Sequence, residues 1–236
     1  MINIATSAWH AFKEILAPRH CEICEKHIGE IPHRFEFICN NCADSLEPGI
    51  PPDKLLNRFV KIFKNDEIAV NWACGLYSFS DELPISRLIY ALKYRGASRI
   101  GLEFGAELGE VLQFLKRTDY DILLPVPIHH ARKRERGYNQ SEKIAEGIST
   151  VLKTPVRADI AKRTRYTLSQ TTLSAAERFK NVANVFKVIK KEEIHNKKIL
   201  LIDDIFTTGA TLNACAAVLL ENGAREVHTA VLAVAT

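Results

Sequence analysis

One segment near the C-terminus of this chain restricts its fold and its chemistry more than any other. Residues 199–202 are aliphatic, Asp203 and Asp204 follow them, and a Thr/Gly-rich turn over residues 207–211 leads into a helical pattern of apolar residues. Such an apolar run predicts a buried strand, and the charged pair predicts the carboxyl edge of a parallel α/β sheet, where ligands bind. The helix after the turn directs its free N–H groups and positive dipole end to the same place, which suits a phosphate. Because the two aspartates suit sugar hydroxyls instead, the segment indicates a sugar-phosphate ligand.

This segment resembles the 5-phosphoribosyl-1-pyrophosphate signature of the type I phosphoribosyltransferases, in which an apolar strand precedes two acidic residues, Thr-Thr-Gly and a further Thr. The resemblance implies that Asp203 and Asp204 contact the 2′- and 3′-hydroxyls of the ribose. It also implies a loop that holds the 5′-phosphate, made of Thr207, Thr208, Gly209, Ala210 and Thr211. An Asp-Asp pair alone would also fit an ordinary strand end, but the complete run favours a phosphoribosyl ligand.

Four of the six cysteines form two Cys-x2-Cys pairs near the N-terminus, Cys21 with Cys24 and Cys39 with Cys42. This spacing is typical of a structural zinc site, in which four thiolates surround the metal and leave no open position. The alternative is two disulfides, which are uncommon in a protein that is not secreted. We therefore predict a zinc-binding module that stabilises a segment too short to build its own core. Because zinc knuckles also occur in nucleic-acid-binding proteins, an interaction role stays open.

A second chemical segment follows the predicted strand over residues 120–126. A Pro-x-Pro corner at 125–127 ends the strand, and Arg132, Lys133, Arg134 and Arg136 then place four cations among five residues. These side chains repel one another unless solvent or an anion offsets their charge. A solvated loop is one interpretation. A pyrophosphate clamp or a nucleic-acid contact is the other, because arginine suits multidentate phosphate binding.

Residues 163–182 combine mixed polarity with little apolar periodicity and are predicted to form a long loop. Long loops in compact domains are often functional lids. A basic lid that closes over a pyrophosphate would exclude water and neutralise the leaving group.

Taken in order, the cysteine pairs, Pro-Val-Pro-x-His, Arg-Gly-Tyr-Asn-Gln, Arg-x3-Thr-x2-Gln and Asp-Asp-x2-Thr-Thr-Gly resemble the ComF/GntX family. Its members are phosphoribosyltransferase-like proteins associated with natural competence or, in name, with gluconate utilisation. The resemblance implies a pyrophosphate loop at residues 126–129 and a flexible catalytic loop at residues 163–178. The implied ligand-binding residues outside the Thr/Gly turn are Val126, Pro127, His129, Arg136 and Lys93, and the implied catalytic residues besides the aspartates are Arg163 and Arg178. His130 departs from the family, which usually has proline there, and this difference predicts a less rigid corner.

The order of predicted elements indicates an α/β protein: a type I phosphoribosyltransferase-like parallel sheet flanked by helices, with a small N-terminal zinc-ribbon-like module. Strands separated by helices favour a parallel sheet. We expect an N-terminal helix and the zinc module within residues 1–60, and the phosphoribosyltransferase-like domain over residues 69–236. The predicted strands cover residues 72–79, 120–126, 184–189, 199–202 and 227–234, and the clearest helices cover residues 83–93 and 141–152. Cys74 and Cys215 stand alone in apolar surroundings and are predicted to be small core residues.

The chain has 236 residues, a net charge of +4 and 47% apolar residues, which permits a sizeable core and anionic partners without requiring them. No apolar run reaches membrane-spanning length. Residues 1–16 lack a basic leader and have the pattern of an amphipathic helix rather than a signal peptide. A cytoplasmic protein is expected.

The predicted activity is the magnesium-dependent displacement of pyrophosphate from C1 of the ribose by an acceptor, most simply a nitrogen nucleophile. The sequence identifies neither the acceptor nor a general base. Two alternatives stay open. The protein could be a non-catalytic sensor of a phosphoribosyl ligand that contacts single-stranded DNA or a helicase during DNA uptake, or a purely structural adaptor.

Overall fold

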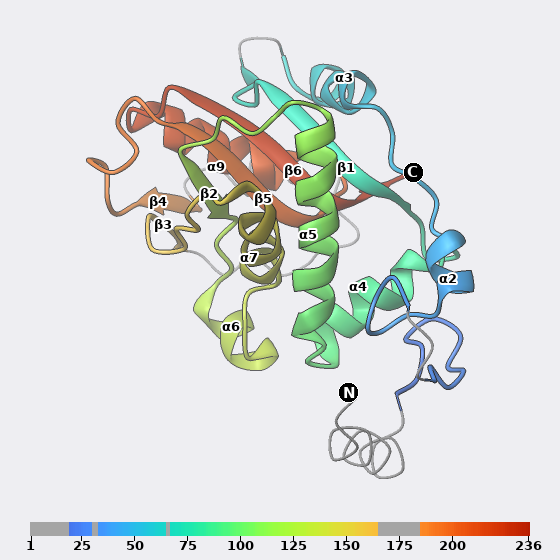
Figure 1. Ribbon diagram of the computed structural model, residues 1–236. Coiled ribbons are helices and arrows are strands. Elements are labelled where there is room, and N and C mark those ends of the chain that lie inside the picture. Colours follow the sequence, from blue (N-terminus) through green and yellow to red (C-terminus); the bar gives the residue numbers. More distant parts are fainter. Residues whose placement is uncertain (1–18, 30–32, 65–66, 165–184) are drawn as a thin grey trace, which may run out of the picture.

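The computed structural model describes residues 19–29, 33–64, 67–164 and 185–236 (Figure 1). Its centre is a parallel sheet of four strands in the order β1 (Trp72–Phe79), β6 (Glu226–Ala235), β5 (Lys198–Phe206) and β2 (Ile122–Pro125). The aliphatic run of the sequence lies in β5, between two other strands, where a strand is covered on both faces. The predicted parallel α/β architecture is confirmed.

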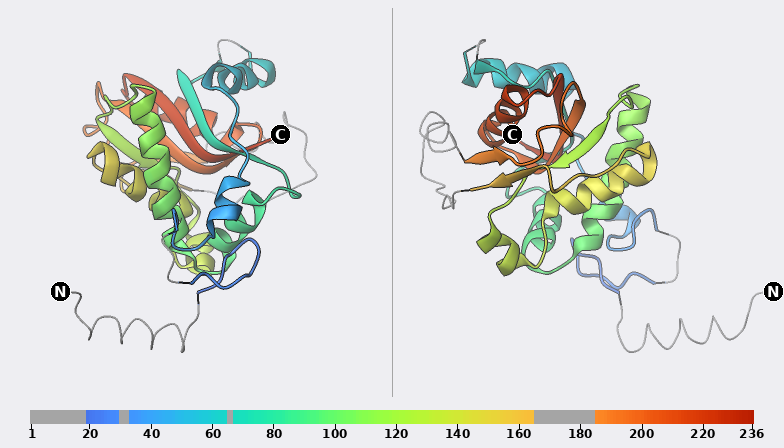
Figure 2. Two further views of the ribbon diagram at one scale, coloured as in Figure 1. Left: turned by 45° about the vertical axis from the view of Figure 1, so that its right-hand side comes forward. Right: turned by 90° about the vertical axis from the view of Figure 1, so that its left-hand side faces the viewer.

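Alternate residues of β5 enter two cores, one on each face of the sheet. Leu200 and Ile202 pack with α4 (Ile85–Tyr94), α5 (Ser98–Phe114) and α7 (Gln140–Leu152). Ile199 and Leu201 pack with α3 (Pro52–Ile62) and α9 (Ala210–Glu221) on the other face. Figures 1 and 2 show this layered arrangement. The period of two along the strand therefore accounts for helices on both sides.

The cysteine-containing segment and α2 (Asn40–Asp44) lie beside α4 and the beginning of α5 (Figures 1 and 2). Phe35 stacks on Phe104 of α5 with ring centroids 4.6 Å apart, and Arg99 pairs with Glu36 at 2.9 Å. Helix α3 instead joins the core on the opposite face, where Phe59 packs edge-on against Phe206 at 5.1 Å. The proposed boundary between a module within residues 1–60 and a domain from residue 69 stays a prediction.

Most predicted elements are present. The strands expected at 72–79, 120–126, 199–202 and 227–234 correspond to β1, β2, β5 and β6, and the helices at 83–93 and 141–152 correspond to α4 and α7. Cys74 and Cys215 are buried, as predicted. The expected N-terminal helix lies outside the described residues.

Several elements in the described part of the chain were not predicted, among them α2 and α3. Helix α5 was not predicted, and the basic stretch is not a loop but the helix α6 (His130–Arg136). The strand expected at residues 184–189 is β4 (Phe186–Val188), but it pairs antiparallel with β3 (Ala161–Arg163) in a separate small sheet. Within the described residues, no helix combines the length and apolar character needed to cross a membrane.

Candidate functional site

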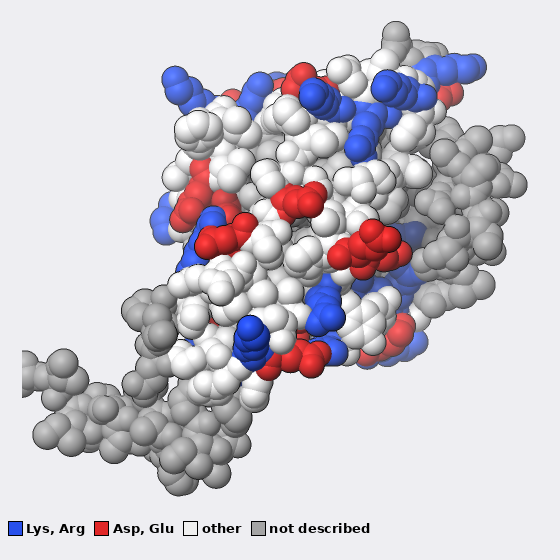
Figure 3. All heavy atoms as spheres, turned by 90° about the vertical axis from the view of Figure 1, so that its right-hand side faces the viewer, with Lys and Arg blue, Asp and Glu red and all other residues white. Residues whose placement is uncertain are grey.

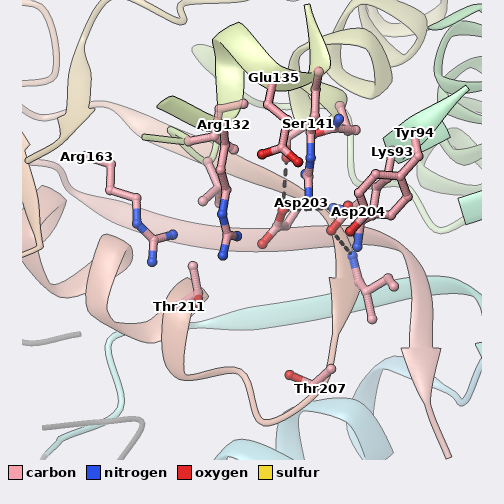
Figure 4. Close-up of a pocket in the computed structure, with 15 residues that line it drawn as sticks. Lys93, Tyr94, Arg132, Glu135, Ser141, Arg163, Asp203, Asp204, Thr207 and Thr211 are labelled. Carbon is pink, nitrogen blue, oxygen red and sulfur yellow. Dashed lines mark hydrogen bonds and ion pairs between the residues drawn. The ribbon is translucent and has the colours of Figure 1, made fainter. Parts of the chain in front are cut away.

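A cavity of about 520 Å³ opens at the carboxyl edge of the parallel sheet, where β2 and β5 end and α9 begins (Figure 4). It brings together residues that the sequence singled out in four separate segments. The predicted residues that line it are Lys93, Val126, Arg136, Arg163, Asp203, Asp204, Thr207 and Thr211. The lining also includes Arg132, one of the four cations of the possible pyrophosphate clamp, together with Tyr94, Glu135, Gln140 and Ser141, which the sequence analysis did not assign to the site.

Asp203 is held at the base of this cavity. One carboxylate oxygen, Oδ1, accepts hydrogen bonds from the hydroxyl group of Ser141 and from the backbone N–H of Asp204, both at 2.9 Å. Burial, followed by the neighbouring charge of Asp204, raises the pKa of Asp203 to about 7. The carboxylate is therefore fixed in orientation and poised to lose a proton when a cation or sugar hydroxyl approaches.

Asp204 makes a different set of contacts. Its Oδ2 atom lies 3.0 Å from the ammonium nitrogen of Lys93, which α4 brings to the site, and its Oδ1 atom accepts the backbone N–H of Ile205. The Asp204 and Lys93 side chains are 14% and 21% exposed. The pair thus places a positive charge directly beside the carboxylate while leaving both groups accessible to a ligand.

The Thr/Gly turn after β5 leads directly into α9. Gly209 adopts a φ of +73°, and a Cβ atom there would lie 2.7 Å from the Phe206 ring and 2.8 Å from the Phe59 ring. Only glycine fits this position without strain. Thr207 and Thr211 line the cavity, whereas Thr208, Gly209 and Ala210 shape the turn without lining it, and Thr208 Oγ1 accepts the N–H of Ala210 at 3.4 Å.

The Gly-Tyr-Asn motif after α6 holds the cavity wall in place. Gly137 ends α6 in the left-handed conformation. The Asn139 side chain donates to the carbonyl of Val126 at 3.0 Å and accepts the N–H of Ser141 at 3.2 Å, so it ties the end of β2 to the start of α7. The hydroxyl group of Tyr138 donates to the carbonyl of Leu92 in α4. These bonds connect the three elements that carry Lys93, Ser141 and the Pro-x-Pro corner.

Two buried donors in the cavity lack a protein partner in the described part of the chain: Nε2 of Gln140 and Nε of Arg136. Gln140 is 1% exposed, and its Oε1 atom already accepts a hydrogen bond from Arg136 at 3.0 Å. A buried donor without an acceptor costs about 1–3 kcal/mol. An oxygen-rich ligand would satisfy both groups. The sequence signal for Gln140 was its place in the Arg-Gly-Tyr-Asn-Gln motif.

Further cations approach from α6 and β3. Arg163 of β3 points toward the cavity beside Arg132 (Figure 4). Burial and the nearby charge of Arg132 lower the pKa of Arg163, which indicates that this wall favours an anion. Figure 4 shows the two guanidinium groups facing the end of Thr211 across the cavity.

Three predicted site residues lie differently. Pro127 and His129 do not line the cavity, and Arg178 lies outside the described residues. His129 instead begins α6, accepts the N–H of Ala131 at 3.3 Å and packs against the His130 ring at 4.0 Å. Its partial burial, followed by the nearby charge of His130, lowers the pKa of His129, which favours the neutral imidazole.

Glu135 was missed by the sequence analysis because it sits among four cations and looks like a solvated charge. It lines the cavity from α6. Among the described residues, its carboxylate takes part in no hydrogen bond or ion pair, in contrast to Asp203 and Asp204. Of the three carboxylates that line the cavity, Glu135 is therefore the one that no described residue engages.

The four predicted zinc ligands, Cys21, Cys24, Cys39 and Cys42, converge on one point, with all Sγ atoms within 4.8 Å of one another. The Sγ atoms of Cys24 and Cys39 are 3.8 Å apart. A tetrahedron with Zn–S bonds of about 2.3 Å has an edge of about 3.8 Å, so the cluster fits a four-thiolate metal site. Burial opposes ionisation of Cys21, but backbone N–H groups outweigh it and lower the pKa of this thiol to about 7.

Comparison with known proteins agrees with this geometry. A profile of the phosphoribosyl transferase domain matches residues 111–235. Competence protein F of Haemophilus influenzae is 33% identical over 221 residues, which cover 88% of this chain and 87% of that protein. The chain belongs to the ComF family of phosphoribosyltransferase-like proteins.

Two other relatives of this ComF protein carry related names. DNA utilization protein YhgH of Salmonella typhimurium is 32% identical over 219 residues and covers 90% of each chain. Competence protein ComFC of Bacillus subtilis is 26% identical over 159 residues, covering 67% of this chain and 62% of its own.

Proposed function

We propose that this ComF protein binds 5-phosphoribosyl-1-pyrophosphate with Mg²⁺ in the cavity and transfers the phosphoribosyl group to an acceptor, releasing pyrophosphate. One observation carries the proposal: the adjacent aspartates, the Thr/Gly turn at the start of α9 and a wall of cations all border the same cavity. Each of the three parts of the ligand, ribose, phosphate and pyrophosphate, thus has chemically suitable partners.

In this arrangement the 5′-phosphate occupies the turn at residues 207–211, where hydroxyl groups and the helix N-terminus favour an anion. The ribose hydroxyls face Asp203 and Asp204. The pyrophosphate faces the cationic side, whose members are Lys93, Arg132, Arg136 and Arg163. The unpartnered donors of Gln140 and Arg136 supply hydrogen bonds to ligand oxygens.

Magnesium fits the donors that the site offers, because it prefers carboxylate oxygens together with ligand phosphates. Asp203 and Asp204 are the residues that would hold it. When bound, it neutralises charge on the pyrophosphate. The raised pKa of Asp203 is consistent with a group that ionises only when a cation or the ligand compensates its burial.

During transfer, the bond between C1 and the pyrophosphate oxygen breaks and positive charge develops on the ribose. The two aspartates favour that charge, while the arginines stabilise the departing pyrophosphate. The acceptor nitrogen forms the new bond to C1 and must lose a proton. We assign that proton to Glu135, the cavity carboxylate that no described residue engages.

The second candidate function is that of a non-catalytic sensor of a phosphoribosyl ligand that contacts single-stranded DNA or a competence helicase. The names of the relatives favour a role in competence and DNA utilization, and the basic helix α6 lies beside the cavity. On the face shown in Figure 3, acidic and basic side chains of the described residues are interspersed, so a nucleic-acid backbone finds no continuous basic surface there. Binding of DNA through α6 would weaken steeply as the salt concentration rises.

Calorimetric titration with 5-phosphoribosyl-1-pyrophosphate and Mg²⁺ tests the proposal. The Asp203→Asn/Asp204→Asn variant should lose binding at least a hundredfold, because both carboxylates contact the ligand. The matched control is Asp53→Asn/Glu110→Gln, which changes two exposed carboxylates outside the cavity. Binding that survives in the Asp203/Asp204 variant would reject this site. Binding without pyrophosphate release in any acceptor screen would favour the sensor.

A further inference from the structure

Helix α4 contacts the cysteine segment (residues 19–29 and 33–46) along its length and the candidate site at its last turn (Figures 1 and 4). The guanidinium group of Arg87 donates a hydrogen bond to the backbone carbonyl of Ile23. Arg95, the residue that follows the helix, pairs with the carboxylate of Glu22 at 3.4 Å. Both of these partners lie inside the first Cys-x2-Cys pair, so the two arginines bind directly to the part of the chain that carries the thiols.

The cysteine segment depends on its thiol cluster for a fixed conformation. Ile23 and Ile28 are 8% and 1% exposed and belong to the same buried cluster as Leu88 and Ile89 of α4. The segment is too short to build a core by itself, so a metal held by the four thiols supplies much of its folding energy. The carbonyl and the carboxylate that the two arginines contact are therefore fixed in place only while the thiols are held together.

A second cavity, of about 300 Å³, lies between the cysteine segment and α4. Glu22 and Glu25 line it from the cysteine segment, and Arg87 and Arg95 line it from the other side. Around this cavity the two elements are joined by polar bonds across a hollow, and such bonds can open without exposing an apolar surface. The joint can therefore adopt two arrangements, one bonded and one open.

The last turn of α4 connects this joint to the candidate site. Lys93 lies two residues before Arg95, and its ammonium group contacts Asp204 at 3.0 Å. The carbonyl of Leu92 accepts a hydrogen bond from the hydroxyl group of Tyr138. Because the last four carbonyls of a helix have no partner within the helix, outside contacts decide how well its final turn is ordered. The cysteine segment supplies such a contact on one side, and the candidate site supplies the others.

We infer that a metal at the four cysteines regulates the candidate site through α4. With the metal bound, the cysteine segment holds Arg87 and Arg95, and the ordered last turn keeps Lys93 against Asp204. This inference rests on the proposed function and names a regulation of the same site. It requires reciprocity: the factor by which the metal improves binding of the phosphoribosyl ligand is also the factor by which the ligand improves binding of the metal. We expect a factor of about five, less than the effect of losing the Lys93 side chain altogether.

The test measures the zinc affinity of the protein by competition with the chelator 4-(2-pyridylazo)resorcinol, with and without 5-phosphoribosyl-1-pyrophosphate and Mg²⁺. In the wild type, the ligand should raise the zinc affinity about fivefold. Arg87→Met/Arg95→Met keeps the four thiols and should still bind one zinc ion, but the ligand should no longer change its zinc affinity. The matched control is Arg99→Met, because Arg99 pairs with Glu36 of the cysteine segment from α5 and not from α4. This control should show the same coupling as the wild type.

A mutant cycle tests whether the connection runs through Lys93. Arg87→Met/Arg95→Met should weaken binding of 5-phosphoribosyl-1-pyrophosphate about fivefold in the wild-type background. The same two changes should have no effect in Lys93→Met, because that variant has already lost the contact with Asp204. If the two effects multiply instead, Lys93 is not the connection and the inference is wrong.

Hydrogen exchange reports on α4 in the absence of any ligand. The backbone N–H groups of residues 91–94 should exchange about threefold faster in Arg87→Met/Arg95→Met than in the wild type, because the last turn is held less firmly. Arg99→Met should match the wild type, and the exchange of α9 should be the same in all three proteins. Equal exchange at residues 91–94 in the three proteins would show that the cysteine segment does not order the end of α4.

The failure of this inference can be told apart from the failure of the proposed function. If the phosphoribosyl ligand binds to the wild type without changing its zinc affinity, or if the wild type holds no metal, the proposed function stands and the regulation is wrong. The regulation is also wrong if Arg87→Met/Arg95→Met couples the two ligands as the wild type does. If the phosphoribosyl ligand does not bind at all, the proposed function fails, and hydrogen exchange still decides whether the cysteine segment orders the end of α4.

Discussion

The ammonium group of Lys93 lies 3.0 Å from the carboxylate of Asp204, although Lys93 belongs to the last turn of helix α4 and Asp204 belongs to β5. The contact joins the helix that flanks the cluster of four cysteines to the strand that carries the acidic pair. It also sets the charge of the cavity before any ligand arrives, because a partly buried carboxylate interacts strongly with a cation at this distance.

Replacing Lys93 by methionine removes this cation while keeping the length of the side chain. We expect the dissociation constant for 5-phosphoribosyl-1-pyrophosphate with Mg²⁺ to rise about tenfold, which is about 1.4 kcal/mol. The free energy of unfolding should fall by less than about 1 kcal/mol, because the pair is partly exposed. Lys143→Met is the control, since Lys143 pairs with Glu146 away from the cavity. Unchanged ligand affinity in Lys93→Met would exclude Lys93 from the site.

Asp203 should make the protein less stable as the pH rises. Its pKa is about 7 in the folded chain because burial and the charge of Asp204 disfavour ionisation, and is about 3.9 in the unfolded chain. The folded state therefore binds more protons between these values, so stability falls as the pH rises from about 4 to about 7. Asp203→Asn, which can keep both hydrogen bonds to Oδ1, should match the wild type near pH 4 and exceed it by roughly 2–4 kcal/mol near pH 8.

Urea unfolding near pH 4, 6 and 8 measures this difference. Asp119→Asn serves as the contrast, because a hydrogen bond from Lys198 lowers the pKa of the exposed Asp119 carboxyl. Because that effect develops mainly below about pH 4, Asp119→Asn should be less stable than the wild type by a nearly constant amount at all three pH values. Equal pH profiles for wild type and Asp203→Asn would show that Asp203 is not destabilised by its burial.

Gly209 should tolerate no side chain. An alanine there combines the cost of a left-handed backbone with a clash against Phe59 and Phe206, so we expect a loss of roughly 2–4 kcal/mol. Gly96→Ala separates the two effects, because Gly96 has a φ of +70° with nothing within 4 Å of a new Cβ atom. It should cost only about 1 kcal/mol in thermal or urea unfolding. If Gly209→Ala and Gly96→Ala lose similar amounts of unfolding free energy, the contacts with Phe59 and Phe206 do not add to the cost.

The purified protein should contain one zinc ion per chain, bound by the four clustered cysteines. Cys39→Ser should lose the metal and lower the melting temperature by roughly 6–12 °C, equivalent to about 3 kcal/mol. Cys74→Ser, at a buried cysteine outside the cluster, should keep the full metal content. Plasma mass spectrometry measures the zinc content of each protein. A wild-type protein that melts at the same temperature after its metal has been removed would contradict a structural zinc site.

Glu135→Gln tests the assignment of the proton acceptor once an acceptor substrate is found. The rate of pyrophosphate release should fall by roughly 10²–10³ while the affinity for 5-phosphoribosyl-1-pyrophosphate stays the same. The control Glu142→Gln alters a carboxylate that pairs with Lys133 outside the cavity. If Glu135→Gln releases pyrophosphate at the wild-type rate, Glu135 is not the proton acceptor, and solvent or another group takes the proton.

The parts of the site that lie close together in the chain could be predicted from the sequence. The apolar run, the two aspartates and the turn at Gly209 are contiguous, and each carries a strong local signal. Ser141, Glu135 and Tyr94 were missed because their roles depend on packing between distant segments. A serine near a helix start, a glutamate among arginines and a tyrosine at a helix end have no distinctive local pattern.

The fold was predictable to a similar extent. Strands β5 and β6 are buried on both faces and are therefore apolar throughout their centres. Helix α5 escaped prediction because glycines interrupt its apolar pattern. Gly105 and its partner Gly147 in α7 allow a close helix crossing, where a Cβ at either position would lie 2.2 Å from a carbonyl oxygen of the other helix. The short strands β3 and β4 depend on pairing with each other, which no local pattern reveals.

A crystal structure with Mg²⁺ and 5-phosphoribosyl-1-pyrophosphate would show directly whether the ligand binds in this cavity. We expect electron density for the ribose hydroxyls against Asp203 and Asp204, and for the 5′-phosphate in the turn from Thr207 to Thr211. The pyrophosphate should face Lys93 and the arginines. A ligand bound elsewhere, or one whose 5′-phosphate lies outside the turn, would show that this cavity is not the phosphoribosyl site.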